Sequence, residues 1–285
     1  MTTTASSPGH PGPSTLRGSA ALPAPVGRAG LSGALRSEFT KIRSTRSTYW
    51  ALLAMFVATV GFGALASWGA AHSHNPGGPG FDATQNSLGG LYISQLIIAV
   101  LGALTITSEY STGMMRTSLA ALPRRGTVFA AKAIVFTVVA LVTGLVTTFA
   151  SFFLGQALMS GQHINTTLGQ PNVLRAVIGG ALFLTVCGLL AFGIGMILRH
   201  TAGAITAAIG LLFVLSVVVH FLPDSWQVHV DKWMPALAGS GIWATVAPPP
   251  GDTPMFSAWA GFAVLAGYAA VAMAAGLVVF FRRDA

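Results

Sequence analysis

The chain has 285 residues, of which 53% are hydrophobic and 8% charged, and its mean hydropathy is +0.70. An ordinary soluble domain carries roughly 25% charged residues, so this composition excludes a surface that is solvated by water throughout. A net charge of +8 would suggest nucleic-acid binding in a soluble protein. The apolar residues instead come in blocks of about 20, the length that crosses a bilayer core. The sequence therefore predicts an all-α integral membrane protein, with the lipid bilayer and no nucleic acid as a partner.

The first thirty residues are rich in Pro, Ala, Gly, Ser and Thr and contain no apolar run. They lack the apolar region of a signal peptide, so we expect residues 1–30 to be a disordered cytoplasmic tail. Cys187 is the only cysteine and lies within an apolar block. An internal disulfide is therefore excluded, and a small core residue is the plain interpretation.

Residues 31–48 follow the pattern of an amphipathic helix ahead of the first span. Apolar residues recur at steps of three and four, which places them on one helical face. They are Leu31, Ala34, Leu35, Phe39 and Ile42. The basic residues Arg36, Lys41 and Arg43 lie off that face, as suits a helix lying along an anionic leaflet, where each basic residue gains about 1 kcal/mol. Glu38 falls within the apolar arc, so it either has a specific basic partner or extends to water.

Residues 49–285 contain six apolar blocks, each roughly long enough to span a bilayer. The blocks cover residues 49–71, 88–107, 133–154, 176–198, 202–222 and 257–280. Small residues recur at four-residue spacing within them, for example Gly63 with Ser67 and Ala272 with Gly276. Such spacing lets helix backbones approach closely in lipid. We expect a six-transmembrane-helix bundle.

The basic residues indicate the orientation of these spans. With six spans, both termini lie on one side of the membrane, and thirteen basic residues fall on that side against two, Arg175 and Lys232, on the other. The positive-inside rule therefore predicts that both termini are cytoplasmic. Twelve Arg against three Lys, with abundant Ala and Gly, hint at a high-GC bacterial genome and thus at a bacterial plasma membrane.

The loop after the second block, residues 108–126, has the densest polar sequence, SEYSTGMMRTSLAALPRRG. Met115, Leu119 and Leu122 share one helical face, and Pro123 ends the predicted helix. Glu109, Arg116, Arg124 and Arg125 supply its charges. Such a segment either docks on a soluble motor subunit or is a positively charged loop that fixes orientation, and the residues alone leave both interpretations open.

A second amphipathic stretch lies between the fifth and sixth blocks. Trp226, Val230, Trp233 and Leu237 follow helical spacing, and Pro235 limits the far end. Asp224 and Ser225 are available as an N-cap. We expect a short outer interfacial helix with tryptophan at the headgroup level. The Pro-Pro-Pro-Gly run over residues 248–251 then breaks regular structure.

The sequence contains few signals of catalytic or metal-binding chemistry. No phosphate loop G-x-x-x-x-G-K-[ST] is present, so we expect no ATPase activity by that route. All six blocks lack Asp, Glu, Lys and Arg, which disfavours autonomous ion-driven transport. His72 and His74 form a His-x-His pair without a third ligand beside it, so a solvated loop is favoured over a metal site. We expect no catalytic and no metal-binding residues.

Three stretches of the sequence resemble the permease subunits of type-2 ABC exporters, in particular the short six-span bacterial group. They are residues 37–50 (SEFTKIRSTRSTYW), residues 107–132 (TSEYSTGMMRTSLAALPRRGTVFAAK) and the outer helix at 222–241. Glu109 and Gly113 match the family's Glu followed by Gly four residues later, with Met114 where many members have Thr. The resemblance implies that this segment, including Tyr110, Met115 and Arg116, is the coupling helix that docks on the ATPase. Residues 31–46, with Arg36, Glu38, Phe39, Lys41 and Arg43, resemble the family's connecting helix.

The resemblance further implies a half-transporter that pairs with a second permease copy, as a homodimer or heterodimer, and with two separate ATP-binding subunits. ATP and Mg²⁺ would then be bound by those subunits, and no cofactor by this chain. Family members export drugs, antibiotics, peptides and polysaccharides, so the cargo does not carry over. We interpret the chain as the permease of an ATP-driven exporter. The alternative is an autonomous secondary transporter or channel for a lipophilic substrate.

Overall fold

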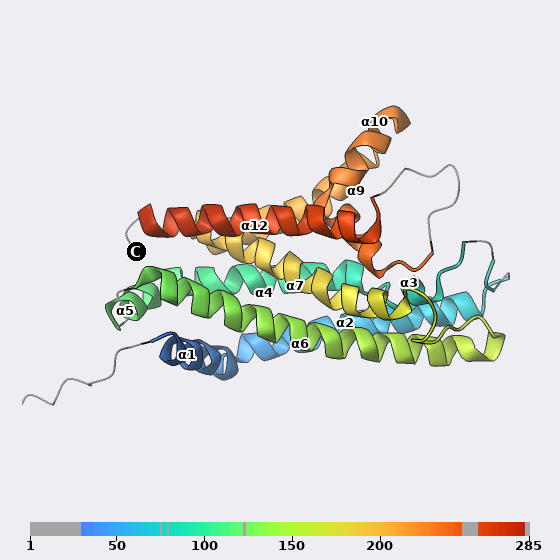
Figure 1. Cartoon of the computed structure of the whole chain (residues 1–285), viewed down its shortest axis with the longest axis horizontal. Helices are drawn as coiled ribbons and strands as arrows, with labels where there is room; N and C mark the ends of the chain where they lie inside the picture. The colour runs from blue at the N-terminus through green and yellow to red at the C-terminus, as the bar shows by residue number, and fades with distance from the viewer. Residues whose placement is uncertain (1–29, 75, 79, 122–123, 247–255, 283–285) are drawn as a thin grey trace, which may run out of the picture.

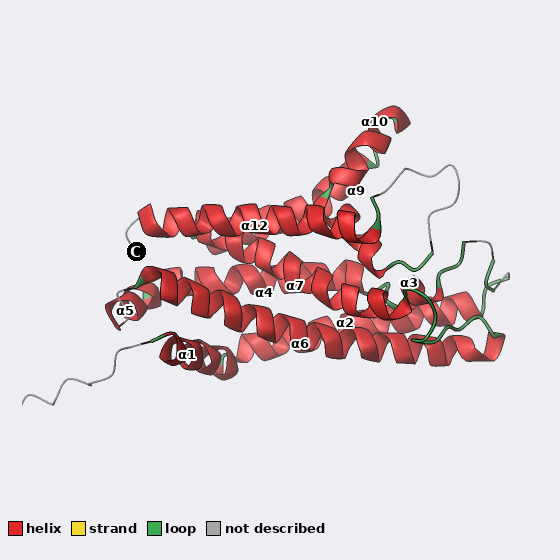
Figure 2. Cartoon of the chain, in the orientation of Figure 1, coloured by secondary structure: helices red, strands yellow, loops and turns green. Residues whose placement is uncertain are grey.

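The computed structural model describes residues 30–74, 76–78, 80–121, 124–246 and 256–282, and within them every regular element is a helix (Figure 2). Six of these helical segments are long and apolar enough to cross a membrane. They are α2 (Arg46–Ala71), α4 (Leu91–Ser111), α6 (Arg125–Met159), α7 (Val173–Leu198), a composite of α8 (Thr201–Ile209), the π-helical turn η2 (Gly210–Val214) and α9 (Leu215–Val219), and α12 (Ala258–Arg282). The predicted all-α, six-span architecture is confirmed.

The span α7 lies at the centre of the bundle, in contact with α4, α6, α8 and α12 (Figure 1). Glycines permit the close approach. A Cβ on Gly102 of α4 would overlap the carbonyl oxygen of Gly188 of α7, and a Cβ on Gly193 of α7 would overlap the backbone of Ala272. Helices in lipid associate by such close packing because lipid offers no hydrophobic drive for association.

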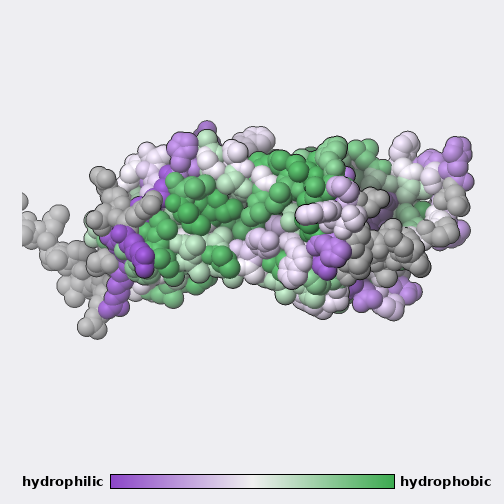
Figure 3. Space-filling view, turned by 90° about the horizontal axis from the view of Figure 1, so that it is seen from above, coloured by the Kyte–Doolittle hydropathy of each residue, from purple (hydrophilic) through white to green (hydrophobic). Residues whose placement is uncertain are grey.

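Eight short helices flank the spans. They are α1 (Leu31–Ser44), α3 (Ala83–Ser87), α5 (Met114–Ala121), η1 (Ser160–Gln162), α10 (Asp224–Val230), η3 (Asp231–Trp233), α11 (Pro235–Ser240) and η4 (Gly241–Trp243). α1, α5 and the end of α12 lie at one end of the bundle, and α3 lies toward the other (Figure 1). We name these the α5 end and the α3 end. Apolar side chains dominate the surface between them, and hydrophilic side chains gather mostly toward the ends (Figure 3).

Several helix boundaries differ from those predicted. The connecting helix α1 ends at Ser44 instead of continuing to residue 48, because Thr45 adopts an extended conformation (φ −89°, ψ 109°) before α2 begins at Arg46. The second and third spans extend beyond their apolar blocks at the α5 end, so Glu109 belongs to α4 and Lys132 to α6. Gly113 separates α4 from α5 with φ of +70°, a left-handed conformation that glycine adopts without steric cost.

The outer interfacial helix is not one continuous helix, so this prediction is wrong in detail. Pro223, and neither Asp224 nor Ser225, stands at the N-cap of α10. Pro235 limits the far end as predicted, since η3 ends at Trp233 and Met234 before the proline is extended (ψ 125°). Pro235 also begins α11, because proline suits the first turn, whose N–H groups are unpaired. The segment then turns into the bundle, where Trp243 is fully buried.

Three sequence predictions lie outside the described residues. They concern the tail up to residue 29, the residues Leu122 and Pro123 after α5, and the proline run at 248–251.

Candidate coupling site at the α5 end

α1 packs on α6 with only part of the predicted apolar face. Ala34 and Glu38, one helical turn apart, are buried, whereas Leu31 and Phe39 are exposed. A helix beside a bilayer can direct apolar side chains to lipid, so the apolar arc need not face the protein. The carboxylate of Glu38 is directed inward. Of the two alternatives left open by the sequence, a basic partner or extension to water, the structure shows the basic partner.

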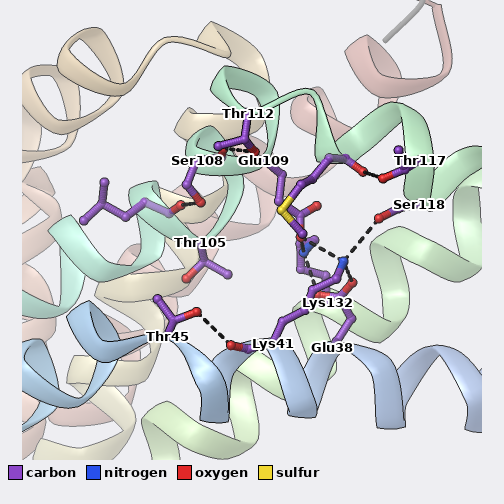
Figure 4. A network of polar contacts seen from close by, with 12 residues as sticks. Glu38, Lys41, Thr45, Thr105, Ser108, Glu109, Thr112, Thr117, Ser118 and Lys132 are labelled. Carbon is purple, nitrogen blue, oxygen red and sulfur yellow. Dashed lines mark hydrogen bonds and ion pairs between the residues drawn. The ribbon is translucent and has the colours of Figure 1, made fainter.

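That partner is Lys132, in a cluster of four charged side chains from α1, α4 and α6. The Lys132 ammonium donates to Glu38 at 2.6 Å and to Glu109 at 2.7 Å. Lys41 Nζ donates to the other oxygen of Glu38 at 2.8 Å and to Glu109 Oε1 at 3.0 Å. It also donates to Ser118 Oγ of α5 at 3.2 Å. Figure 4 shows these side chains converging between the helices. We call Glu38, Lys41, Glu109 and Lys132 the four-charge cluster.

The cluster is formally neutral and largely excluded from water. The side chains of Lys132, Glu38 and Glu109 are only 3%, 7% and 8% exposed. Burial alone would lower the pKa of Lys41, but its hydrogen bonds to Glu38 and Glu109 outweigh burial and hold that pKa above its ordinary value of 10.5. Lys41 therefore stays charged at physiological pH, and each carboxylate keeps two ammonium partners.

A cavity of about 370 Å³ lies beside the cluster, between α1, the start of α2 and α4. The cluster residues form part of its wall, and the hydroxyls of Thr45, Thr48, Thr105 and Ser108 add polar groups. The α5 end is therefore not tightly filled where α1 meets α4.

The predicted coupling residues lie in different environments. Glu109 and Met115 are buried, with Glu109 in the cluster and Met115 in the apolar core. Tyr110 packs against the core, and the Arg199 guanidinium lies 4.9 Å from its ring centroid. Gly113 forms the turn between α4 and α5, and Arg116 lies within α5. Glu109 thus contacts other helices of the same chain.

The predicted connecting-helix residues point either into the bundle or out of it. Glu38 and Lys41 face the cluster, whereas Arg36, Phe39 and Arg43 are exposed on α1. The predicted set therefore contains both an inward-facing ionic pair and an outward-facing basic surface.

Arginines at the same end bind the last turn of α12. Arg125 of α6 donates to the carbonyl oxygen of Phe280 at 3.1 Å, and Arg199 donates to that of Val279 at 3.2 Å. The last carbonyls of a helix have no partners within the helix and carry partial negative charge, so basic side chains stabilise them. The C-terminal span is thereby tied to α6 and α7.

Sequence reasoning missed the structural roles of Lys132 and Asp82. Lys132 was counted as an orienting charge, although its position directly before an apolar block was a signal that the helix could bury it. At the α3 end, Asp82 caps α3 through the Gln85 amide at 2.9 Å. Its carboxylate also accepts hydrogen bonds from both the amide and the hydroxyl of Thr245 and from the Val246 amide. This carboxylate fastens the segment before α12 to the bundle.

The described parts of the chain contain no group of three or more His, Cys, Asp or Glu side chains placed to hold a metal ion. Cys187 is fully buried in α7. Among the polar contacts of the described residues, the four-charge cluster joins helices that are distant in sequence, and the Asp82 clasp joins the start of α3 to the segment after η4.

A family model described as ABC-2 family transporter protein matches residues 34–226. The match covers more than half of the chain, from α1 through α10, and includes the whole four-charge cluster. The chain therefore belongs to the ABC-2 transporter family, and with its six spans it is the multi-pass permease of an ABC transporter. Comparison with curated proteins found no match.

Replacing Lys132 with Met leaves the buried carboxylates of Glu38 and Glu109 with Lys41 as their one remaining cluster partner. Removing one member of a buried ion pair typically costs about 3 to 5 kcal/mol. We expect a clear fall in the thermal unfolding temperature of the purified protein in detergent. Arg43→Met is the matched control, since it removes an exposed charge of α1 outside the cluster. Equal unfolding temperatures for the two variants would contradict this role of Lys132.

Proposed function

We propose that this permease belongs to an ATP-driven exporter and that the α5 end docks on a separate ATP-binding subunit. The observation that supports this most directly is the four-charge cluster, which joins α1 to α4 and α6 and reaches Ser118 of α5. A displacement of α5 or α1 by a partner would therefore be felt by two membrane-spanning helices. Packed elements and ionic networks of this kind carry coupling between sites.

The short helix α5 offers a surface for such a partner. Met115 and Leu119 pack toward the core, whereas Met114, Thr117 and Ala120 are exposed. Met114 is an exposed apolar side chain at a polar end of the molecule, where a protein contact would remove it from water. In this proposal the outer face of α5 contacts the ATP-binding subunit, and Glu109 acts inside the permease by holding α1 and α6.

The α5 end also has room to rearrange. The cavity beside the cluster separates part of α1 from α4. Within the described residues, Oε2 of Glu109 is buried without a hydrogen-bond donor. A buried acceptor without a partner is costly, so a second arrangement that supplies a donor is favourable for this group. We propose that ATP binding and hydrolysis shift α1 between two such arrangements.

The remaining parts of the proposed transporter lie outside this chain. ATP and Mg²⁺ belong to the ATP-binding subunit, because the sequence has no phosphate loop. A second permease copy would complete the path across the membrane. The fifth span supports a partner within the bilayer, since α9 diverges from the bundle with α10 (Figure 1), and Phe213 of η2, Val217 of α9 and Phe221 after it are exposed. Multidrug or antibiotic efflux is the activity proposed from the family resemblance, which leaves the individual cargo open.

Met114→Glu should weaken binding of the proposed ATP-binding subunit, because a new carboxylate must lose its hydration at the contact. We expect loss of co-purification and of permease-dependent ATP turnover in lipid nanodiscs, with an unchanged thermal unfolding temperature. Val246→Glu is the control. Val246 is as exposed as Met114, at 44% each, but lies at the α3 end. Normal co-purification of Met114→Glu would exclude α5 as the docking surface.

The proposed orientation places the α5 end in the cytoplasm of a bacterial cell and the α3 end outside. Cys187 is the only cysteine and is buried, so single cysteines can be introduced at exposed positions. A membrane-impermeant maleimide should label Ser73→Cys in intact cells and Ser37→Cys only after permeabilisation. The parent chain is the control for background labelling. Labelling of Ser37→Cys in intact cells would reverse the proposed orientation.

A further inference from the structure

An apolar groove of about 320 Å³ runs between α1 and α6, and no member of the four-charge cluster lines it. Its walls are aliphatic and aromatic, and Arg36 is the charged residue in the lining. The lining includes Leu35, Arg36 and Phe39 of α1 and Ile134, Val135 and Val138 of α6. The lining is almost entirely apolar, so Arg36 contributes its methylene groups to the groove, and the guanidinium of this exposed residue is left for the rim.

The position of the groove suits a lipid. Its α6 wall belongs to the third membrane span, whereas α1 lies beside that span near the α5 end (Figure 1). The groove thus lies between the apolar surface of a membrane span and the basic helix α1. The side chains of Val138 and Phe39 are both exposed, so a lipid acyl chain beside the protein can contact both of them.

The charges around the groove select an anion. The acidic residues of this region, Glu38 and Glu109, are directed inward and bound by Lys41 and Lys132. Arg36 forms no ion pair with a described residue and remains exposed on the outer surface of α1. A guanidinium presents paired N–H donors that match the oxygens of a phosphate.

We propose that the groove binds one anionic phospholipid of the surrounding leaflet, with the phosphate on Arg36 and an acyl chain along Phe39 and Val138. The lipid joins α1 to α6 at a face that the ionic cluster leaves open. Its occupancy adds a second attachment of α1 to α6 beside the ionic cluster and thereby regulates the helix that carries Glu38 and Lys41. The binding step depends on the membrane setting of the chain and not on the ATP-binding partner.

The test uses the purified full-length chain in detergent, with native mass spectrometry to count bound lipids. The probes are phosphatidylglycerol and phosphatidylcholine with identical acyl chains. We expect one tightly retained phosphatidylglycerol per chain, favoured over phosphatidylcholine by about fivefold, because the choline cation offsets the attraction of the phosphate to Arg36, which is worth about 1 kcal/mol. Equal retention of the two lipids would overturn the proposal.

Two matched pairs of variants locate the site. Arg36→Gln should abolish the preference for phosphatidylglycerol, whereas Arg43→Gln, which changes an exposed arginine outside the groove, should retain it. Val138→Trp should fill the groove and release both lipids. Val142→Trp, one turn further along α6, should not, although Val138 and Val142 are similarly exposed, at 54% and 56%.

Three results would contradict a specific lipid site. Equal effects of the two arginine variants would indicate diffuse attraction to a basic surface. Equal effects of the two tryptophan variants would exclude the groove as the acyl-chain site. If Val138→Trp alters the oligomeric state and leaves phosphatidylglycerol retention intact, then a second copy of the chain occupies the groove in place of a lipid.

Discussion

Charged side chains at the ends of membrane helices cannot leave water unless other charges neutralise them, and the arrangement at the α5 end follows from this constraint. Two carboxylates and two ammonium groups meet there, and the carboxylates and Lys132 are almost fully buried. A buried ion pair adds little net stability compared with apolar packing, but it strongly opposes separation of its members. The cluster therefore opposes displacement of α1, because Glu38 and Lys41 of α1 pair with Lys132 of α6 and Glu109 of α4.

The two ends of the bundle are built on the same principle with different partners. At the α3 end, the buried carboxylate of Asp82 accepts backbone hydrogen bonds from the segment ahead of α12. At the α5 end, side chains from three helices pair with one another next to a cavity of about 370 Å³. Backbone hydrogen bonds fix a loop to the fold, whereas side-chain ion pairs beside open space can exchange partners. This contrast supports the proposal that the α5 end is the moving part of the permease.

The fold was largely predictable because the length of each apolar block in the sequence corresponds to the length of a membrane span. The six apolar blocks correspond to six membrane-spanning segments, and the helical pattern predicted for residues 31–48 corresponds to α1. The boundaries were less predictable, since α4 and α6 continue past the apolar residues as helices that bury Glu109 and Lys132. In the outer segment a helix ends before Pro235 as predicted, but the start of α11 at the same proline was not predicted.

Sequence analysis singled out Glu38, Lys41 and Glu109 but gave Lys132 only an orienting role, and it gave no geometry for the cluster. Glu38 stood out because a carboxylate interrupted an apolar arc, and its partner was left open. Lys132 lies 94 residues from Glu38 in sequence, and no local pattern connects the two. The exposure of Leu31 and Phe39 was likewise not predictable, because an apolar residue of a membrane protein can face either lipid or protein.

The central claim is that the four-charge cluster holds α1 against α6, and a distance distribution between spin labels tests it most directly. Labels at Ser37→Cys on α1 and Val142→Cys on α6 report that attachment, while buried Cys187 remains unlabelled. In nanodiscs we expect a narrow distribution for the otherwise unchanged chain and for Arg43→Met, and a broad one when Lys132→Met removes the shared ammonium. An equally narrow distribution in the Lys132→Met variant would show that packing alone positions α1 and would contradict the claim.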